Sequence, residues 1–198
     1  ILIVEILGAK MLSPFLGTSH FVWTAQIAVT LVALSLGYYI GGWLVDKSPK
    51  LGHLYYAILA AAAYLAATVP MVKPICLKLI KLPLAWATLL SSIFLFLVPL
   101  ALLAMTGPFL IRLLTKSVKN VGSNVGRLSA ISTLGSVLGT MLIGYLLIPH
   151  LPNSVIMLMT AGFLIILSTI YFVFWNKGRG MNVIILTLGL SIIMGYSG

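Results

Sequence analysis

The chain consists of long apolar runs that alternate with short stretches of polar, glycine and proline residues. Within the runs, hydrophobic residues follow one another without the apolar–polar alternation of a half-buried strand. Backbone groups in lipid must be hydrogen-bonded within the protein, so apolar runs of about 20 residues predict transmembrane helices. The expected helices cover about 1–12, 20–45, 51–72, 82–114, 126–148 and 154–175, and a seventh run covers 181–196.

The pattern therefore predicts an all-α, polytopic integral membrane helix bundle. Residues 1–175 are expected to form a six-helix membrane bundle. Residues 176–198 are expected to form a cytoplasmic turn and a seventh helix that is short or truncated. The first run has no Met, no basic n-region and no signal-peptide cleavage site, so we interpret it as the last part of an incomplete helix.

Proline and glycine indicate where the helices end or bend. The first helix should end before Pro14 and Gly17, because proline interrupts the hydrogen-bond ladder. The run over 82–114 is long and contains three prolines, so we expect a kink or a tilt there. Pro149 should end the fifth helix.

The composition is also that of a membrane protein. Of 198 residues, 61% are hydrophobic and 7% are charged, and the mean hydropathy is +1.18. A soluble domain carries about 25% charged residues. The net charge of +10 would suggest a nucleic-acid partner in a soluble protein. Here the basic residues lie mainly between apolar runs, where they orient helices and meet anionic headgroups, so we expect no nucleic-acid partner.

The basic residues also predict an orientation. Eight fall on one side of the expected bundle: Lys47, Lys50, Arg112, Lys116, Lys119, Arg127, Lys177 and Arg179. Four fall on the other: Lys10, Lys73, Lys78 and Lys81. The positive-inside rule makes the side with eight cytoplasmic. The stretch 73–81 would then carry three lysines outside, and we interpret it as a short segment lying on the membrane surface.

Glu5 is one of only two acidic residues and falls within an apolar run. An ionisable group at the centre of a span costs at least about 2.5 kcal/mol, which makes Glu5 a functional candidate. It could carry a proton, bind a cation or pair with a buried basic group. The alternative is a structural role, in which its side chain forms an interhelical hydrogen bond.

Small residues recur at four-residue spacing in two of the expected helices. Gly37 and Gly41 share one face of the second helix. In the fifth, Gly135 and Gly139 share one face, and Ser132, Ser136, Thr140 and Gly144 share another. Such faces let a neighbouring backbone approach closely, so we predict close helix packing at these positions. Glycine-rich faces in transporters can also permit sliding or bending, and the sequence leaves both roles open.

The other acidic residue, Asp46, follows the second apolar run. In the simplest interpretation it is a solvated carboxylate paired with Lys47, worth about 0–1 kcal/mol. The stretch "GGWLVDKSPK" suggests more, since it places Gly42, Asp46, Lys47 and Lys50 in the order of a known loop motif. It resembles the cytoplasmic loop between helices two and three of the major facilitator superfamily, with Pro49 in place of the usual glycine. The resemblance implies that Asp46 caps a helix or meets a basic side chain, with Arg112 and Arg127 as the expected partners.

A broader resemblance covers most of the first six helices. It includes Glu5, Gly8, Pro14, Gly17, Trp23, the "LSLGYY" run and, in the fifth helix, "GRLSAISTLGSVLGTMLIGYLLIP". These elements resemble the membrane region of the fused transporter-like spermidine synthases, which precedes a polyamine aminopropyltransferase domain. Residues 176–198 contain no acid and no Gly-x-Gly-x-x-Gly loop, so the catalytic half is not on this chain.

The resemblance leaves two functions open. In the first, the chain is a transporter-like module for a polyamine or a related small cation, and it works with a second copy or a partner because it has the size of one facilitator half. In the second, it is a non-transporting anchor or structural subunit of a larger membrane complex, or of a separately encoded aminopropyltransferase. In both, we expect a multi-pass protein of a prokaryotic plasma membrane, surrounded by lipid and associated with itself or with other subunits.

We expect no enzymatic activity and no cofactor. Serine, histidine and acidic residues have no nucleophile-elbow context. The lone Cys76 permits no internal disulfide, and there is no Cys/His cluster with the spacing of a metal site. The three histidines, His20, His53 and His150, fall near expected helix ends and do not form the facing pair that a bis-histidine haem requires.

Overall fold

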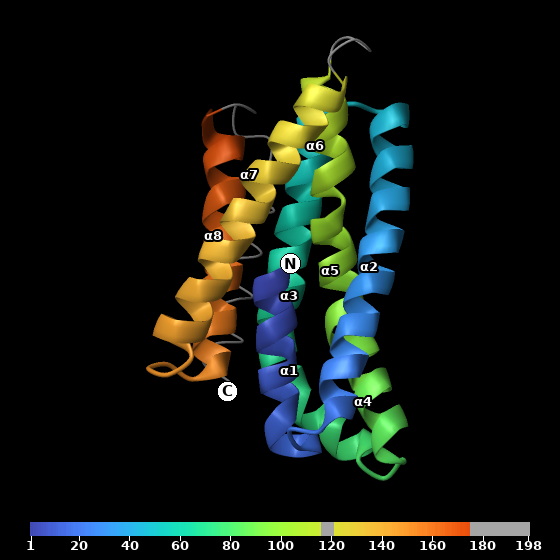
Figure 1. Cartoon of the computed structure of the whole chain (residues 1–198), viewed down its shortest axis with the longest axis vertical. Helices are drawn as coiled ribbons and strands as arrows, with labels where there is room; N and C mark the ends of the chain where they lie inside the picture. Colours follow the sequence, from blue (N-terminus) through green and yellow to red (C-terminus); the bar gives the residue numbers. More distant parts are fainter. Residues whose placement is uncertain (116–120, 175–198) are drawn as a thin grey trace.

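A computed structural model of the chain describes residues 1–115 and 121–174, and these residues form helices and short connections without strands (Figure 1). The helices in chain order are α1 (Leu2–Leu16), α2 (His20–Lys47), α3 (Leu51–Leu79), α4 (Leu84–Ser92), the π-helix η1 (Ile93–Leu97), α5 (Val98–Ala104), α6 (Thr106–Leu114), α7 (Val121–Met141), the π-helix η3 (Leu142–Leu147) and α8 (Asn153–Phe174). The expected all-α class is therefore confirmed. The run over 181–196 lies outside the described residues.

Five of the helical segments are long and apolar enough to cross a membrane: His20–Lys47, Leu51–Leu79, Leu84–Leu114, Val121–Leu147 and Asn153–Phe174. Helix α1 has 15 residues, which at 1.5 Å per residue is about 22 Å and shorter than the hydrocarbon core of about 30 Å. The five long apolar helices are those of a multi-pass membrane protein.

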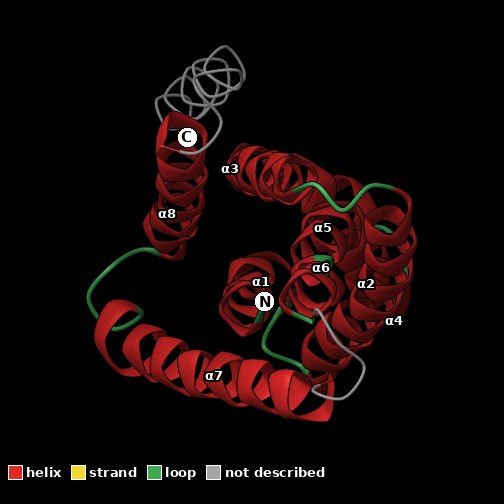
Figure 2. Ribbon diagram, turned by 90° about the horizontal axis from the view of Figure 1, so that it is seen from above, coloured by secondary structure: helices red, strands yellow, loops and turns green. Residues whose placement is uncertain are grey.

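The long helices run in alternating directions along one axis, and α1 lies among them (Figures 1 and 2). Helix α3 packs along α8, and α2 packs along α4, α5 and α6. Helix α7 crosses the bundle obliquely and contacts α1 and α6 (Figure 2). The buried side chains of α1, including Leu7 and Leu12, form one core with those of α3, α5 and α8. The outward faces of α2 and α7 expose many large apolar side chains, as lipid-facing surfaces do.

Two expected helix ends are wrong. Helix α1 continues through Pro14 to Leu16, and Gly17 ends it with a positive φ of 78°. Helix α3 continues through Pro70 and Pro74 to Leu79, so the stretch 73–81 does not form a separate surface segment. The reason is burial, since Val72 and Cys76 carry the buried face of α3 into its last turns. A helix of 29 residues is about 43 Å long, longer than the hydrocarbon core, so its end can extend beyond it.

The fourth span departs from a regular α-helix at two places, as the expected bend requires. A π-helix over Ile93–Leu97 precedes Pro99, and a break at Met105 separates α5 from α6 just before Pro108. The fifth span shows the same relation, with η3 ending shortly before Pro149. Proline lacks an N–H and crowds the carbonyl four residues earlier, and a widened turn relieves both effects.

Candidate functional site

Glu5 lines an open cavity of about 540 Å³ between the helices, whose wall includes the exposed side chains of Tyr38 and Phe163. Helices α1, α2, α3, α5, α6, α7 and α8 all contribute to its wall. The polar lining side chains besides Glu5 are Thr30, Tyr38, Thr106, Ser132, Ser136 and Thr160. The wall also includes Ile1 at the start of α1, and most of its remaining side chains are apolar, among them Leu34, Ile58 and Leu103.

The Glu5 side chain is half-buried, and in the described part of the chain no basic side chain pairs with it. The second acid of the chain, Asp46, lies at the far end of α2 and does not reach this cavity. An ionised carboxylate away from water is costly unless it is paired, so Glu5 favours a proton or a cation beside it. The structure thus leaves Glu5 available for either role.

Helix α7 gives the cavity two of its six hydroxyl side chains, Ser132 and Ser136, which the sequence analysis did not predict. We expected the small residues of this helix to bring two backbones together. No residue of α7 is buried, and no neighbouring atom lies within 4 Å of where a Cβ on Gly135 would be, so that prediction is wrong for Gly135. At Gly139 a Cβ would lie 3.1 Å from Cδ1 of Ile3 in α1. The serines at positions 132 and 136 instead face the cavity.

The helical spacing of these serines is the signal that could have identified the polar face. Ser129, Ser132, Thr133 and Ser136 follow the i, i+3, i+4, i+7 spacing of one helical face. The sequence analysis interpreted serine and glycine alike as small residues. The structure separates them by their neighbours, since Ser132 and Ser136 line the cavity whereas no atom lies within 4 Å of a Cβ on Gly135.

The other pair of small residues, Gly37 and Gly41 of α2, does lie where two helix backbones come close together. A Cβ on Gly37 would collide with the carbonyl oxygen of Ala101, and a Cβ on Gly41 would lie 2.9 Å from Cα of Met105. Helix α2 therefore packs against the backbone of α5 and α6 at these two glycines. This contact holds the cavity wall formed by Thr30 and Tyr38 of α2 next to that formed by Thr106.

The turn after α2 brings two of the predicted residues together. Arg112 Nε lies 3.4 Å from Asp46 Oδ1, and this is the one ion pair among residues 1–115 and 121–174. Both side chains are well exposed, at 62% for Arg112 and 73% for Asp46. Arg127, the other expected partner, makes no such pair.

The remaining residues of the turn motif have other contacts. Lys47 does not pair with Asp46, and its Nζ lies 4.8 Å from the centre of the Trp43 ring. Lys50 precedes the first turn of α3, and its carbonyl accepts a hydrogen bond from the N–H of His53. A Cβ on Gly42 would meet no neighbouring atom. The motif therefore joins α2 to α6 through one exposed ion pair.

A buried amide is a further polar feature that sequence reasoning missed. Gln26 of α2 is completely buried, and neither Nε2 nor Oε1 has a hydrogen-bond partner. It packs against Gly8 of α1, where an added Cβ would lie 2.7 Å from Nε2. Its position in the apolar run was the available signal, since a lone glutamine there faces either protein or a polar space.

No metal centre is present in the described ranges, where no three His, Cys, Asp or Glu side chains gather. The rings of His20 and Phe21 lie tilted against each other with centroids 4.1 Å apart, and the carbonyl of Leu146 accepts a hydrogen bond from Nδ1 of His150. Cys76 is buried and unpaired with another cysteine.

Neither a protein-family model, nor a curated protein, nor a solved structure matches the chain.

Proposed function

We propose that the chain is a transporter-like membrane module whose ligand is a small cation held by Glu5. The observation that carries this proposal is the position of Glu5, the one acid among the residues that line a mainly apolar cavity between the helices. Ionisable groups within membrane spans are costly, and they are found at substrate or ion pathways and in proton relays. The hydroxyls around the cavity can complete the coordination of a cation or hold water.

The number of acidic side chains at the cavity limits the positive charge that a ligand can carry. Glu5 can neutralise one positive charge, and Asp46 is too far away to add a second. A single amine or a proton therefore fits this chain by itself. A polyamine, which the family resemblance suggests, would need a further acid from a second copy or a partner subunit.

By the resemblance of its sequence, we propose that the module corresponds to one six-helix half of a facilitator. Facilitator folds alternate access between two halves around a site near the membrane midplane. We infer that a second copy or a partner supplies the missing half, in a prokaryotic plasma membrane with the basic loops in the cytoplasm. A cysteine at position 50 should then resist an impermeant thiol reagent added outside intact cells, and ready labelling there would reverse the orientation.

Uptake into proteoliposomes tests the transport proposal. Wild type and Glu5→Gln are reconstituted, and proton-coupled uptake of methylamine and of putrescine is followed. We expect Glu5→Gln to abolish uptake, because the amide keeps the size of the side chain but has no charge. Asp46→Asn is the matched control, as it removes the other acid away from the cavity, and it should retain uptake. Uptake that is equal in wild type and Glu5→Gln would contradict the proposal.

The alternative is a membrane anchor for a separate soluble enzyme. The observation that favours it is the excess of basic residues at the end of the bundle that carries Arg112, where one acid is present. Such a surface attracts an acidic protein. Purification in mild detergent separates the two proposals, since a co-purifying soluble aminopropyltransferase favours the anchor and a self-pair favours the transporter.

A further inference from the structure

A cavity of about 300 Å³ lies between α1, α3 and α8, toward the end of the bundle opposite the turn after α2. Three polar side chains line it: Lys73 near the end of α3, and Asn153 and Ser154 in the first turn of α8. Helix α1 contributes only its last turns, at the other end of the helix from Ile1. The rest of the wall is apolar and consists of Met11, Pro14, Phe15, Val69 and Val72. The cavity therefore combines a basic group with an apolar wall.

Asn153 fixes the corner of the cavity at which α8 begins. Its Nδ2 donates a hydrogen bond of 3.4 Å to the backbone carbonyl of Lys10 in α1. The side chain of Lys10 is exposed, so a second lysine lies beside the cavity. The first N–H groups of a helix have no intrahelical partner, and the helix dipole adds partial positive charge at this end. These groups together favour an anion.

The acidic residues of the chain leave these lysines without a carboxylate partner in the part of the chain that the structure describes. Only Glu5 and Asp46 are acidic, and Asp46 pairs with Arg112 at the other end of the bundle. Glu5 forms no ion pair within residues 1–115 and 121–174. The positive charge of Lys73 is therefore available to a ligand.

The position of the cavity along the bundle matches a lipid headgroup layer. At the other end of the same two helices, the rings of Tyr55 in α3 and Tyr171 in α8 stack with centroids 3.9 Å apart, and tyrosines favour the membrane interface. Lys73 follows Tyr55 by 18 residues and Asn153 precedes Tyr171 by 18, which is about 27 Å along each helix. The hydrocarbon core is about 30 Å thick, so Lys73 and Asn153 lie at the opposite interface.

We propose that this cavity binds one anionic phospholipid, whose phosphate lies between Lys73 and the first turn of α8. Basic side chains at the membrane surface attract anionic headgroups, and helix N-termini bind phosphate through their N–H groups. Val69 lies one turn of α3 closer to the bilayer centre than Lys73, so an acyl chain of the same lipid follows it inward. The site is separate from Glu5, and its ligand does not depend on the proposed transport.

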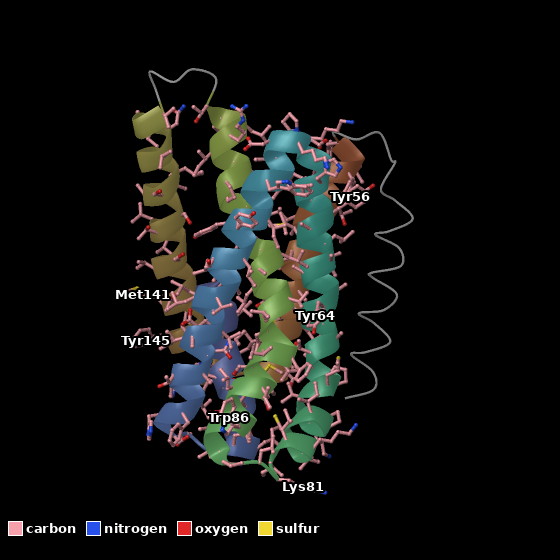
Figure 3. All side chains as sticks on the ribbon, turned by 90° about the vertical axis from the view of Figure 1, so that its right-hand side faces the viewer. Tyr56, Tyr64, Lys81, Trp86, Met141 and Tyr145 are labelled. Carbon is pink, nitrogen blue, oxygen red and sulfur yellow. The ribbon has the colours of Figure 1, made fainter. Side chains whose placement is uncertain are left out.

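Native mass spectrometry of the full chain in mild detergent tests the site, because it resolves the binding of the first lipid. The probes are phosphatidylglycerol and phosphatidylcholine with the same acyl chains, which share the phosphate and differ in net charge. Lys73→Gln removes the charge from the cavity wall, and Lys73→Arg keeps it. Lys81→Gln is the matched control, since it removes a lysine at the same end of the bundle but outside the cavity wall (Figure 3). The melting temperature in phosphatidylcholine alone verifies that each variant is folded.

Wild type should bind the first phosphatidylglycerol about fivefold more tightly than phosphatidylcholine, the factor that one lysine contributes at a membrane surface. Lys73→Gln should lose this preference, whereas Lys73→Arg and Lys81→Gln should retain it. Inorganic phosphate at the same concentration should not displace the lipid, because it has no acyl chain to contact Val69.

Three results would overturn the proposal. Equal affinity of wild type for the two lipids would show that the cavity does not select an anionic headgroup. An equal loss of preference in Lys73→Gln and Lys81→Gln would assign the effect to the net charge of this end of the bundle. Displacement of the lipid by inorganic phosphate would assign the cavity to a free anion.

Discussion

The hydroxyl of Tyr64 in α3 donates a 2.6 Å hydrogen bond to the backbone carbonyl of Phe94 in η1. Tyr64 is labelled on α3 in Figure 3. In a π-helix each carbonyl pairs with the N–H five residues later, and the residue five after Phe94 is Pro99, which has no N–H. Tyr64 therefore supplies the donor that the proline removes. The bend of the fourth span and its contact with α3 depend on each other.

Replacing Tyr64 by Phe should destabilise the bundle by about 0.5–2 kcal/mol, because it leaves the Phe94 carbonyl without this donor at membrane depth. The free energy of unfolding in mixed micelles measures the loss. Tyr145→Phe is the control, since Tyr145 lies on the outward face of the fifth span (Figure 3) and should behave as wild type. Combining Tyr64→Phe with Pro99→Ala restores a backbone N–H and should reduce the cost. An equal cost in both backgrounds would show that Tyr64 acts through packing alone.

Replacing a glycine by alanine should have opposite effects on stability in α2 and in α7. Gly37→Ala should destabilise by about 1–3 kcal/mol, because the new methyl group overlaps the backbone of α5. Gly135→Ala should be neutral or stabilising by up to about 1 kcal/mol, since its Cβ meets no atom and alanine favours helix. Thermal denaturation in detergent compares the two variants. Tolerance of Gly37→Leu as well would argue against the close contact of α2 with α5.

Gly8 and Gln26 should behave as a coupled pair. Gly8→Ala places a methyl group against the amide of Gln26, so it should lower stability in wild type. In the Gln26→Ala background the methyl group has space, and the cost should shrink by about 0.5–3 kcal/mol, the range found for residues in contact. A double-mutant cycle of the two substitutions measures this coupling. Independent effects would mean that α1 and α2 do not meet at these residues.

The Asp46–Arg112 pair should contribute little to the stability of the fold, and its contribution should depend on salt. Both side chains are exposed, so Asp46→Asn should cost about 0–1 kcal/mol and leave membrane insertion intact. At low salt, the double exchange of Asp46→Arg with Arg112→Asp should restore the stability that either single exchange loses. Recovery that persists at 1 M salt would point to a contact other than the ion pair, because the Debye length is then about 3 Å.

Arg127 offers a matched comparison for this pair. It was the other partner expected from the sequence, but it makes no ion pair with Asp46. Arg127→Gln should therefore leave the effect of Asp46→Asn unchanged, whereas Arg112→Gln should remove it. If Arg127→Gln removes the effect instead, Asp46 pairs with a different helix end from the one in the structure.

The sequence alone determined the properties that follow from folding in lipid, namely the helical class and the positions of the long helices along the chain. Apolar run length determined the all-α class and where the long helices lie, because lipid leaves backbone groups no partner outside the protein. The three prolines of the run over 82–114 predicted its bend, and Pro149 predicted the end of the fifth helix, since proline cannot complete the ladder. The order of Asp46 and the basic residues indicated Arg112 as a partner because both end up at the same end of the bundle.

The tertiary structure decided which face of each helix meets protein. Helices α2 and α7 both carry glycines at four-residue spacing, but Gly37 contacts the backbone of α5 whereas Gly135 contacts nothing. In lipid an apolar side chain is equally well placed against a tail or a helix, so hydrophobic pattern does not distinguish the two faces. The cavity at Glu5 and the buried amide of Gln26 follow from the same choice, because they depend on which neighbours surround α1 and not on any property of those residues by themselves.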